Sequence, residues 1–127
     1  MIGALAFDQG DRAAERRTLA AADTFDKTCA RRFIGEYGLR LFRRPLSDAE
    51  IDLFLSLAEA GHDKLGNFYS GLQFALTGML VAPDFLLRIE RFMPDSARPG
   101  SFRLDNYSSA TRLSYFLTGS APDAELL

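Results

Sequence analysis

Three arginines are the residues of this 127-residue sequence best suited to binding chemistry. Arg43 and Arg44 are adjacent, and Arg112 lies much farther along the chain. A guanidinium group presents a planar fork of N–H donors that matches a carboxylate or a phosphate group. We therefore take these arginines as candidate contacts for an anion or for a docking partner.

The favoured interpretation of the first two arginines is structural. Arg43 and Arg44 precede Pro45, which cannot continue a helix, so they fall in the last turn of the preceding helical pattern. Cations at that position complement the helix dipole. One of the two is then expected to pair with an acid such as Asp48 or Glu50.

The other side chains that could carry chemistry lack partners at catalytic spacing. Asp84 and Glu90 do not fall on one face of a helix, so we expect them to serve in capping and surface ion pairs. Cys29 repeats with apolar residues and is expected to be a small buried side chain. His62 follows Gly61 and is expected in an exposed loop.

Composition limits the kinds of site that the chain can form. One cysteine and one histidine exclude a disulfide within the chain, thiolate clusters, Cys-x-x-Cys-His haem attachment and multi-histidine metal sites. We therefore expect no metal and no cofactor in this chain. No stretch approaches the roughly 20 apolar residues of a membrane-spanning helix.

A nucleic-acid partner is not expected either. The chain has 15 basic and 17 acidic residues, which gives a net charge of −2. The arginines from Arg31 to Arg44 form a local basic cluster, but the aromatic residues between them fall at core positions. We interpret the cluster as a solvated helix face.

Helical periodicity predicts an all-α fold, a small bundle of about four helices followed by the first helices of a second domain. The first helix is expected from about Asp26 to Arg43, with Asp26 as its N-cap. Its buried face is predicted from apolar residues at i+4 spacing, which are Cys29, Phe33, Tyr37 and Leu41.

Three further helices are expected before residue 93. Ser47 and Glu50 form a capping box that starts the second helix, which Gly61 is expected to end. The third helix carries the broadest apolar stripe, which consists of Phe68, Leu72, Ala75, Leu76, Met79 and Leu80. Pro83 starts a short fourth helix whose inward side chains are predicted to be Phe85, Leu86, Ile89 and Phe92.

The remaining sequence is less regular. Region 93–103 is rich in proline, glycine and serine and has no alternating strand pattern, so it is predicted to be a linker. A fifth helix is expected to begin near Asp105, with one side formed by Tyr107, Ala110, Leu113 and Leu117. Ser120 is expected to cap one more helix, and we expect the chain to be a fragment.

These patterns divide the chain into four regions. Residues 1–26 are a poorly defined N-terminal segment, residues 27–92 a helical domain, residues 93–103 a linker, and residues 104–127 the truncated start of a second helical domain.

Several motifs in combination resemble a bacterial two-domain arrangement. They are Cys29-Ala30-Arg31-Arg32, Phe42-Arg43-Arg44-Pro45-Leu46, Pro83-Asp84-Phe85-Leu86 and Arg112-Leu113-Ser114-Tyr115-Phe116-Leu117. Residues from about 27 to 92 resemble the domain of unknown function numbered 1595, and residues from about 103 to 127 resemble the start of the domain numbered 1592. Such domains occur consecutively in large planctomycete-type proteins.

The resemblance implies a context rather than an activity. Proteins of this group are exported, to the periplasm or the cell surface, and often carry a c-type cytochrome domain, so haem is implied only for a parent protein. No catalytic residues are known to carry over. The chain departs from the pattern at Thr118, where tryptophan is common, and it lacks a second cysteine ahead of Cys29.

The function is unknown from these residues, and three hypotheses remain. The preferred one is a non-catalytic structural or docking module whose partners are neighbouring domains of a larger polypeptide, with Tyr107, Tyr115 and Phe116 partly exposed for contact. The alternative is a part of a redox or hydrolytic enzyme whose active site other domains complete, which predicts acids with shifted pKa values in a shared cleft. The third is a free-standing binder that uses the arginine cluster for anions or nucleic acid.

Overall fold

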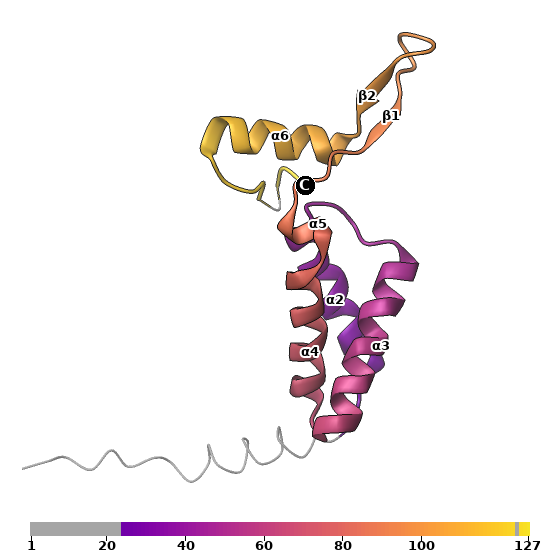
Figure 1. Ribbon diagram of the computed structural model, residues 1–127, viewed down its shortest axis with the longest axis vertical. Helices are drawn as coiled ribbons and strands as arrows, with labels where there is room; N and C mark the ends of the chain where they lie inside the picture. The colour runs from indigo at the N-terminus through magenta and orange to yellow at the C-terminus, as the bar shows by residue number, and fades with distance from the viewer. Residues whose placement is uncertain (1–23, 124) are drawn as a thin grey trace, which may run out of the picture.

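The computed structural model describes residues 24–123 and 125–127 and confirms the all-α prediction (Figure 1). The alanine-rich segment before Thr24 lies outside the described residues. The elements in chain order are α2 (Lys27–Phe42), α3 (Asp48–Leu65), α4 (Phe68–Val81), α5 (Pro83–Leu86), β1 (Phe92–Pro94), β2 (Phe102–Leu104) and α6 (Asn106–Thr118).

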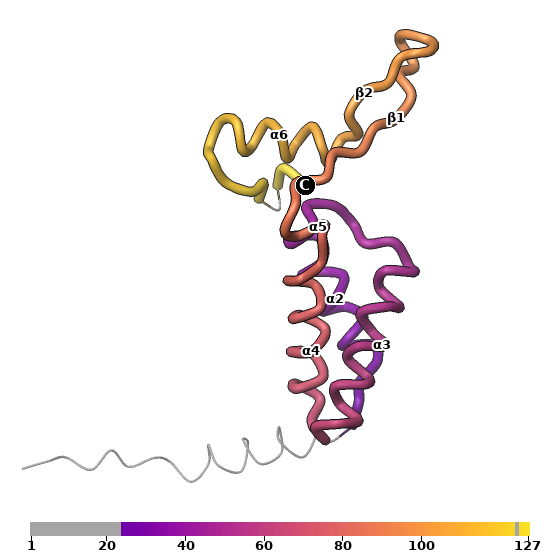
Figure 2. The backbone as a smooth tube through the Cα atoms, in the orientation of Figure 1, coloured from indigo at the N-terminus to yellow at the C-terminus, as the bar shows by residue number. Residues whose placement is uncertain are grey.

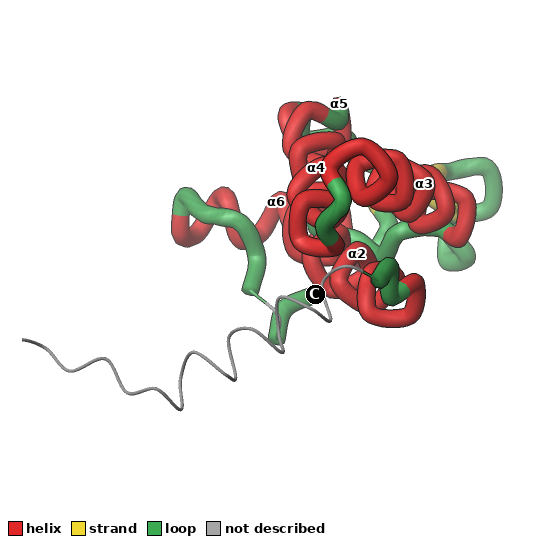
Figure 3. The backbone as a smooth tube through the Cα atoms, turned by 90° about the horizontal axis from the view of Figure 1, so that it is seen from below, coloured by secondary structure: helices red, strands yellow, loops and turns green. Residues whose placement is uncertain are grey.

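Helices α2, α3 and α4 form the bundle, and α3 and α4 make its most extensive contact. Figure 3 shows the three helices side by side, viewed from below. Ile34 and Met79 are fully buried at the centre, and they are surrounded by further core residues: Ala30, Phe42, Phe54, Leu55, Phe68 and Leu72. The short α5 and the hairpin of β1 and β2 lead from the upper end of this bundle to α6 (Figure 2).

Hydrogen bonds at the N-caps confirm the predicted starts of α2, α3 and α6. The Asp26 side chain accepts a bond from the Cys29 amide at 2.8 Å. Ser47 and Glu50 form the full capping box, since each side chain bonds to the other residue's backbone amide. Asp105 caps α6 by accepting a 2.6 Å bond from the Ser108 amide. Short polar side chains therefore fix where the helices begin.

The predicted end of α3 is wrong, because the helix continues through Gly61 to Leu65 and ends at Gly66, whose φ is 66°. Gly61 instead lies at a close approach of α3 and α4, where an added Cβ would be 2.7 Å from Phe74. His62 is consequently in the helix and half-buried rather than in an exposed loop. Both positions require glycine. Gly66 adopts a left-handed backbone conformation, and Gly61 has no side chain that would push α3 and α4 apart.

The buried face of α2 is one residue away from the predicted face. The buried residues are Ala30, Ile34, Gly38 and Phe42. Cys29 and Tyr37 are exposed, so the prediction of a buried cysteine is wrong, while Phe33 and Leu41 lie at the border of the core. A step of one residue turns a helix face by about 100°. Because Ala30 and Gly38 are small, this face of α2 can pack more closely against the other helices than the predicted face could.

A two-stranded antiparallel hairpin occupies the region predicted to be an irregular linker. Phe92 pairs with Leu104 and Pro94 with Phe102. The strands have three residues each, which is too short for an alternating pattern to be visible in the sequence. The residues expected to face inward after α4 are only partly buried, since Phe85 packs on the core but Leu86, Ile89 and Phe92 are exposed.

Helix α6 does not bury the side formed by Tyr107, Ala110, Leu113 and Leu117. Its buried residues are Ser108, Thr111 and Ser114, whereas Leu113 and Leu117 are exposed. Ser120 does not act as the expected N-cap. The backbone amides of Glu125 and Leu126 instead donate to the Asp123 side chain, as amides at a helix start do.

The close crossing of α3 and α4 leads to a stability prediction. In Gly71→Ala the new Cβ would lie 2.5 Å from the Ala58 carbonyl oxygen, so the two helices must separate. We expect a loss of about 1–3 kcal/mol in the free energy of unfolding, measured by urea denaturation. The matched control is Gly35→Ala on α2, which has nothing within 4 Å and should be neutral or stabilising by up to about 1 kcal/mol. Equal effects of the two substitutions would contradict the crossing geometry.

Candidate functional site

Arg44 lies between two carboxylates at the upper end of the bundle. Its Nη2 is 2.6 Å from Glu50 Oε1 and 2.6 Å from Asp84 Oδ1, and its Nη1 is 3.0 Å from Glu50 Oε2. The Arg44 side chain is only 10% exposed. A buried guanidinium group with fork-to-fork bonds on one side and a second acid on the other is a tightly held group.

The backbone of α2 places this guanidinium group. Helix α2 ends at Arg43, which has a left-handed φ of 58° and is the only described non-glycine residue with positive φ. This conformation reverses the chain so that Arg44 turns back over the Phe42 ring, with 5.7 Å between the guanidinium carbon and the ring centroid. A side chain in the left-handed region costs roughly 1–2 kcal/mol, so other contacts must hold it.

Arg43 supplies such contacts. Its Nη2 donates to the carbonyl oxygens of Asp84 at 2.6 Å and of Leu87 at 3.1 Å. These carbonyls lie in and just after α5, where a helix end leaves acceptors without partners. Arg43 therefore ties the end of α2 to α5 and satisfies backbone groups at the same time.

Glu50 has two roles in this cluster. One of its carboxylate oxygens accepts bonds from the Ser47 amide and hydroxyl, both at 2.8 Å, while the carboxylate also binds Arg44. The hydrogen bond from Arg44 is the main cause that lowers the pKa of Glu50 to about 2, and the bonds from Ser47 lower it further. The same bond raises the pKa of Arg44. Both groups are thus held in their charged forms.

Two more arginines connect this cluster to α6. Arg91 Nη2 is 3.4 Å from Asp84 Oδ1, and the Arg91 amide donates to Ser108 Oγ at 2.9 Å. Arg112 on α6 makes a bidentate pair with Glu90, with both N–O distances 2.9 Å. We call Arg43, Arg44, Glu50, Asp84 and Arg91 the arginine junction.

The structure therefore brings Arg43 and Arg44 together and places Arg112 apart from them, on α6. Arg44 pairs with Glu50, as the structural interpretation predicted. The cavity beside the arginine junction has a volume of about 20 Å³, which is space for about one water molecule. The idea that these arginines contact an external anion or partner remains a prediction.

The other residues singled out in the sequence either form ion pairs within the chain or lie away from further ligand-like side chains. Arg31 pairs with Asp48 at 3.0 Å and with Asp52 at 2.7 Å, so this part of the basic cluster is matched by acids of α3. The His62 ring lies 5.5 Å from the Phe25 ring, and its Nδ1 is buried without a hydrogen-bond partner. Within residues 24–123 and 125–127, no group of three or more metal-binding side chains is present.

The described helices include none that could span a membrane.

The sequence reasoning missed the full extent of an apolar surface at the upper end of the molecule. Three residues of α6 project outward, namely Leu113 at 50% exposure, Phe116 at 84% and Leu117 at 67%. We call them the α6 ridge. Their i, i+3, i+4 spacing was visible in the sequence, but the two leucines were grouped with Tyr107 and Ala110 on one side of the helix, apart from Phe116.

The hairpin extends this surface. Because Phe92 pairs with Leu104 and Pro94 with Phe102, these four side chains share one face of the two-stranded ribbon. Phe92 and Phe102 are both more than half exposed. Leu104 also lines a groove with Leu113 and Phe116 of the ridge, so the apolar surface runs from the hairpin onto α6.

Comparison with known proteins gives a family match over part of the chain and no activity. Residues 29–90 match the family described as "PSD5: Protein of unknown function (DUF1595)". This match agrees with the resemblance to the 1595 domain and covers nearly all of the bundle and every member of the arginine junction except Arg91. No curated protein and no solved structure matches the chain significantly.

The pKa of Glu50 leads to a prediction about pH. Because this pKa is lowered from 4.5 to about 2 on folding, the stabilisation is complete above about pH 4.5 and is lost as the pH falls toward 2. Glu50→Gln should cost about 1–3 kcal/mol of unfolding free energy at pH 7, and this difference should shrink over that window. Denaturation at a series of pH values measures it.

The matched control is Glu36→Gln, which removes an exposed pair with Arg32 at 3.7 Å and should change stability by less than about 1 kcal/mol. A difference between Glu50→Gln and the native chain that is constant from pH 7 to pH 2 would contradict the assigned pKa.

The strained backbone of Arg43 gives a second prediction. Both Arg43→Ala and Arg43→Gly lose the bonds to the carbonyls of Asp84 and Leu87, and each variant should be less stable than the native chain. Glycine tolerates a φ of 58°, so the glycine variant should be the more stable of the two by about 1 kcal/mol. Thermal and urea denaturation compare the variants, and an alanine variant as stable as the glycine variant would show that φ carries no strain.

Proposed function

We propose that this chain is a non-catalytic helical module that docks onto neighbouring domains of a larger exported bacterial protein associated with c-type cytochromes. The observation that carries the docking role is the continuous apolar surface of the α6 ridge and the hairpin. Its most exposed member, Phe116, has 84% of its surface open.

The exposure of these side chains supports a contact surface. Burying a phenylalanine or leucine side chain stabilises a complex by roughly 1.5–3 kcal/mol, and clustered apolar residues on a surface mark interaction sites more often than isolated ones do. A two-stranded hairpin is also only marginally stable alone in water. A partner that covers Phe92 and Phe102 would supply the packing that the hairpin lacks.

The arginine junction links this apolar surface to the helical bundle. Arg43 and Arg44 join the ends of α2, α3 and α5, and Arg91 and the Glu90–Arg112 pair continue the connection to α6. Arg88 also lies over the Tyr115 ring at 5.6 Å. The bundle therefore acts as the support that orients α6 and the hairpin toward a partner.

The state of Glu50 favours a structural role over the enzymatic alternative. A general acid or base at neutral pH works best with a pKa near that pH. The pKa of Glu50 is about 2, and its oxygens are occupied by Arg44 and Ser47. This carboxylate suits a permanent ion pair.

The larger context comes from the resemblance. The match of residues 29–90 to a family of unknown function supports the first of the two domains. The assignment of residues 104–127 to the start of a 1592-type domain, the export and the cytochrome association are part of the proposal. On this reading, the α6 ridge is where the second domain continues to pack.

Photo-crosslinking in the native host tests the docking role. Benzoylphenylalanine at position 116 should form a crosslink to a peptide from another part of the same polypeptide, identified by mass spectrometry. The matched control is benzoylphenylalanine at Tyr69, an aromatic residue of α4 that is 50% exposed and should give no specific crosslink.

A crosslink from position 116 to a separate protein would contradict the assignment to neighbouring domains. The absence of any crosslink at that position, with the protein folded, would overturn the docking function itself.

A further inference from the structure

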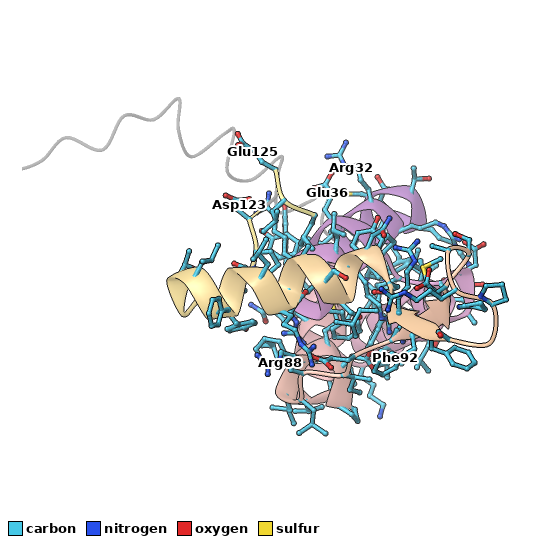
Figure 4. All side chains as sticks on the ribbon, turned by 90° about the horizontal axis from the view of Figure 1, so that it is seen from above. Arg32, Glu36, Arg88, Phe92, Asp123 and Glu125 are labelled. Carbon is cyan, nitrogen blue, oxygen red and sulfur yellow. The ribbon has the colours of Figure 1, made fainter. Side chains whose placement is uncertain are left out.

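A second groove lies on the other side of the α6 ridge from the hairpin. It is lined on one side by Leu113, Ser114 and Leu117 of α6. The other side is the chain after α6, including Asp123, Glu125 and Leu126, and the enclosed volume is about 490 Å³. Figure 4 shows Asp123 and Glu125 beside α6, seen from above.

Hydrogen bonds build the second wall of this groove. Helix α6 ends at Gly119, whose φ of 69° reverses the chain. Ser114 Oγ then donates to the Ser120 carbonyl oxygen at 3.0 Å. Farther on, Asp123 Oδ1 accepts from the amides of Glu125 at 3.2 Å and Leu126 at 3.0 Å. Ser114 therefore ties the start of the returning segment to α6, and Asp123 orders the turn at residues 125 and 126.

The groove combines an apolar floor with an acidic edge. Leu117 is 67% exposed and Leu126 is 44% exposed. Asp123 and Glu125 are both exposed, and no arginine or lysine of the described chain lies within ion-pair distance of either. In this they differ from Glu50, Asp84 and Glu90, each of which has an arginine partner.

We propose that this groove binds an amphipathic helix that places leucine-like side chains on the floor and lysine or arginine residues along the acidic edge. The helix would come from a neighbouring segment of the larger polypeptide, so the inference rests on the proposed docking function and specifies its partner. A helix laid into an apolar groove is anchored by side chains at i, i+3, i+4 and i+7.

Charge complementarity selects this occupant over others. Basic residues opposite Asp123 and Glu125 are attracted, whereas an acidic helix places like charges together, which is unfavourable. The same two carboxylates repel anionic lipid and nucleic acid. A basic-edged helix is the partner whose charge and apolar stripe both fit.

Two model peptides test this chemistry on the chain as it stands. Each is a fluorescent helical peptide of about 14 residues with leucines at i, i+3, i+4 and i+7. One has lysines and the other has glutamates beside the stripe. Fluorescence anisotropy at low salt should show the lysine peptide binding roughly tenfold more tightly.

Variants of the chain locate the binding. The pair Asp123→Asn and Glu125→Gln should remove the difference between the two peptides, and Leu117→Ala should weaken both. Leu117 is 67% exposed, so its truncation leaves the fold intact. The control is Asp63→Asn, an exposed acid of α3 at the far end of the bundle, which should change neither affinity.

The outcomes separate this inference from the docking function. Equal binding of both peptides, or binding of neither, overturns the basic-helix partner, while a crosslink at position 116 would still support docking. If the chain instead forms a dimer in sedimentation that Leu117→Ala dissolves, a second copy occupies the groove and the inference fails. Selective binding of the lysine peptide without a crosslink at position 116 would keep the groove chemistry and overturn the docking function.

Discussion

The guanidinium group of Arg44, nearly buried between Glu50 and Asp84, adds an ionic link between the ends of three helices at the upper end of the bundle. It contacts the first turn of α3 and the start of α5 from a position just beyond the end of α2. A buried charge is costly unless it is matched, and here two acids match it. The neighbouring Arg43 binds the carbonyls at the end of α5. The chain beyond residue 87 leaves the bundle at this point, and Arg91 links it back to Asp84.

The arrangement explains why arginines in this chain act as structural residues. Arg44 binds side chains, Arg43 binds backbone, and Arg112 holds α6 to Glu90 with two parallel hydrogen bonds. Lysine has no planar fork and would not make the bidentate pairs. The bundle core provides apolar packing lower down, while these ion pairs fix the upper end, where few buried apolar residues are present.

The fixed upper end presents two contrasting surfaces, separated by the α6 ridge. Toward the hairpin, the surface is apolar and includes Phe92, Phe102 and Phe116. Toward the returning chain, apolar residues are accompanied by the acids Asp123 and Glu125, which pair with no basic residue among those the structure describes. A neighbouring domain could therefore be both packed and oriented at this end. The match to a family of unknown function concerns the supporting bundle, so the surfaces on α6 are the part from which a function can be inferred.

The sequence alone determined that the chain is helical, where α2, α3 and α6 begin, and that one of Arg43 and Arg44 would pair with a nearby acid. These features depend on residues within one or two turns of each other. It did not determine which face of a helix is buried. In α2 the buried face combines the small residues Ala30 and Gly38 with Ile34 and Phe42. In α6 the buried residues are polar ones such as Ser108, while Leu113 and Leu117 are exposed. Only the packing of distant segments decides how closely two helices approach, and that distance selects the face. The second acidic partner of Arg44, Asp84, is 40 residues away, so only the tertiary structure could bring it to the junction.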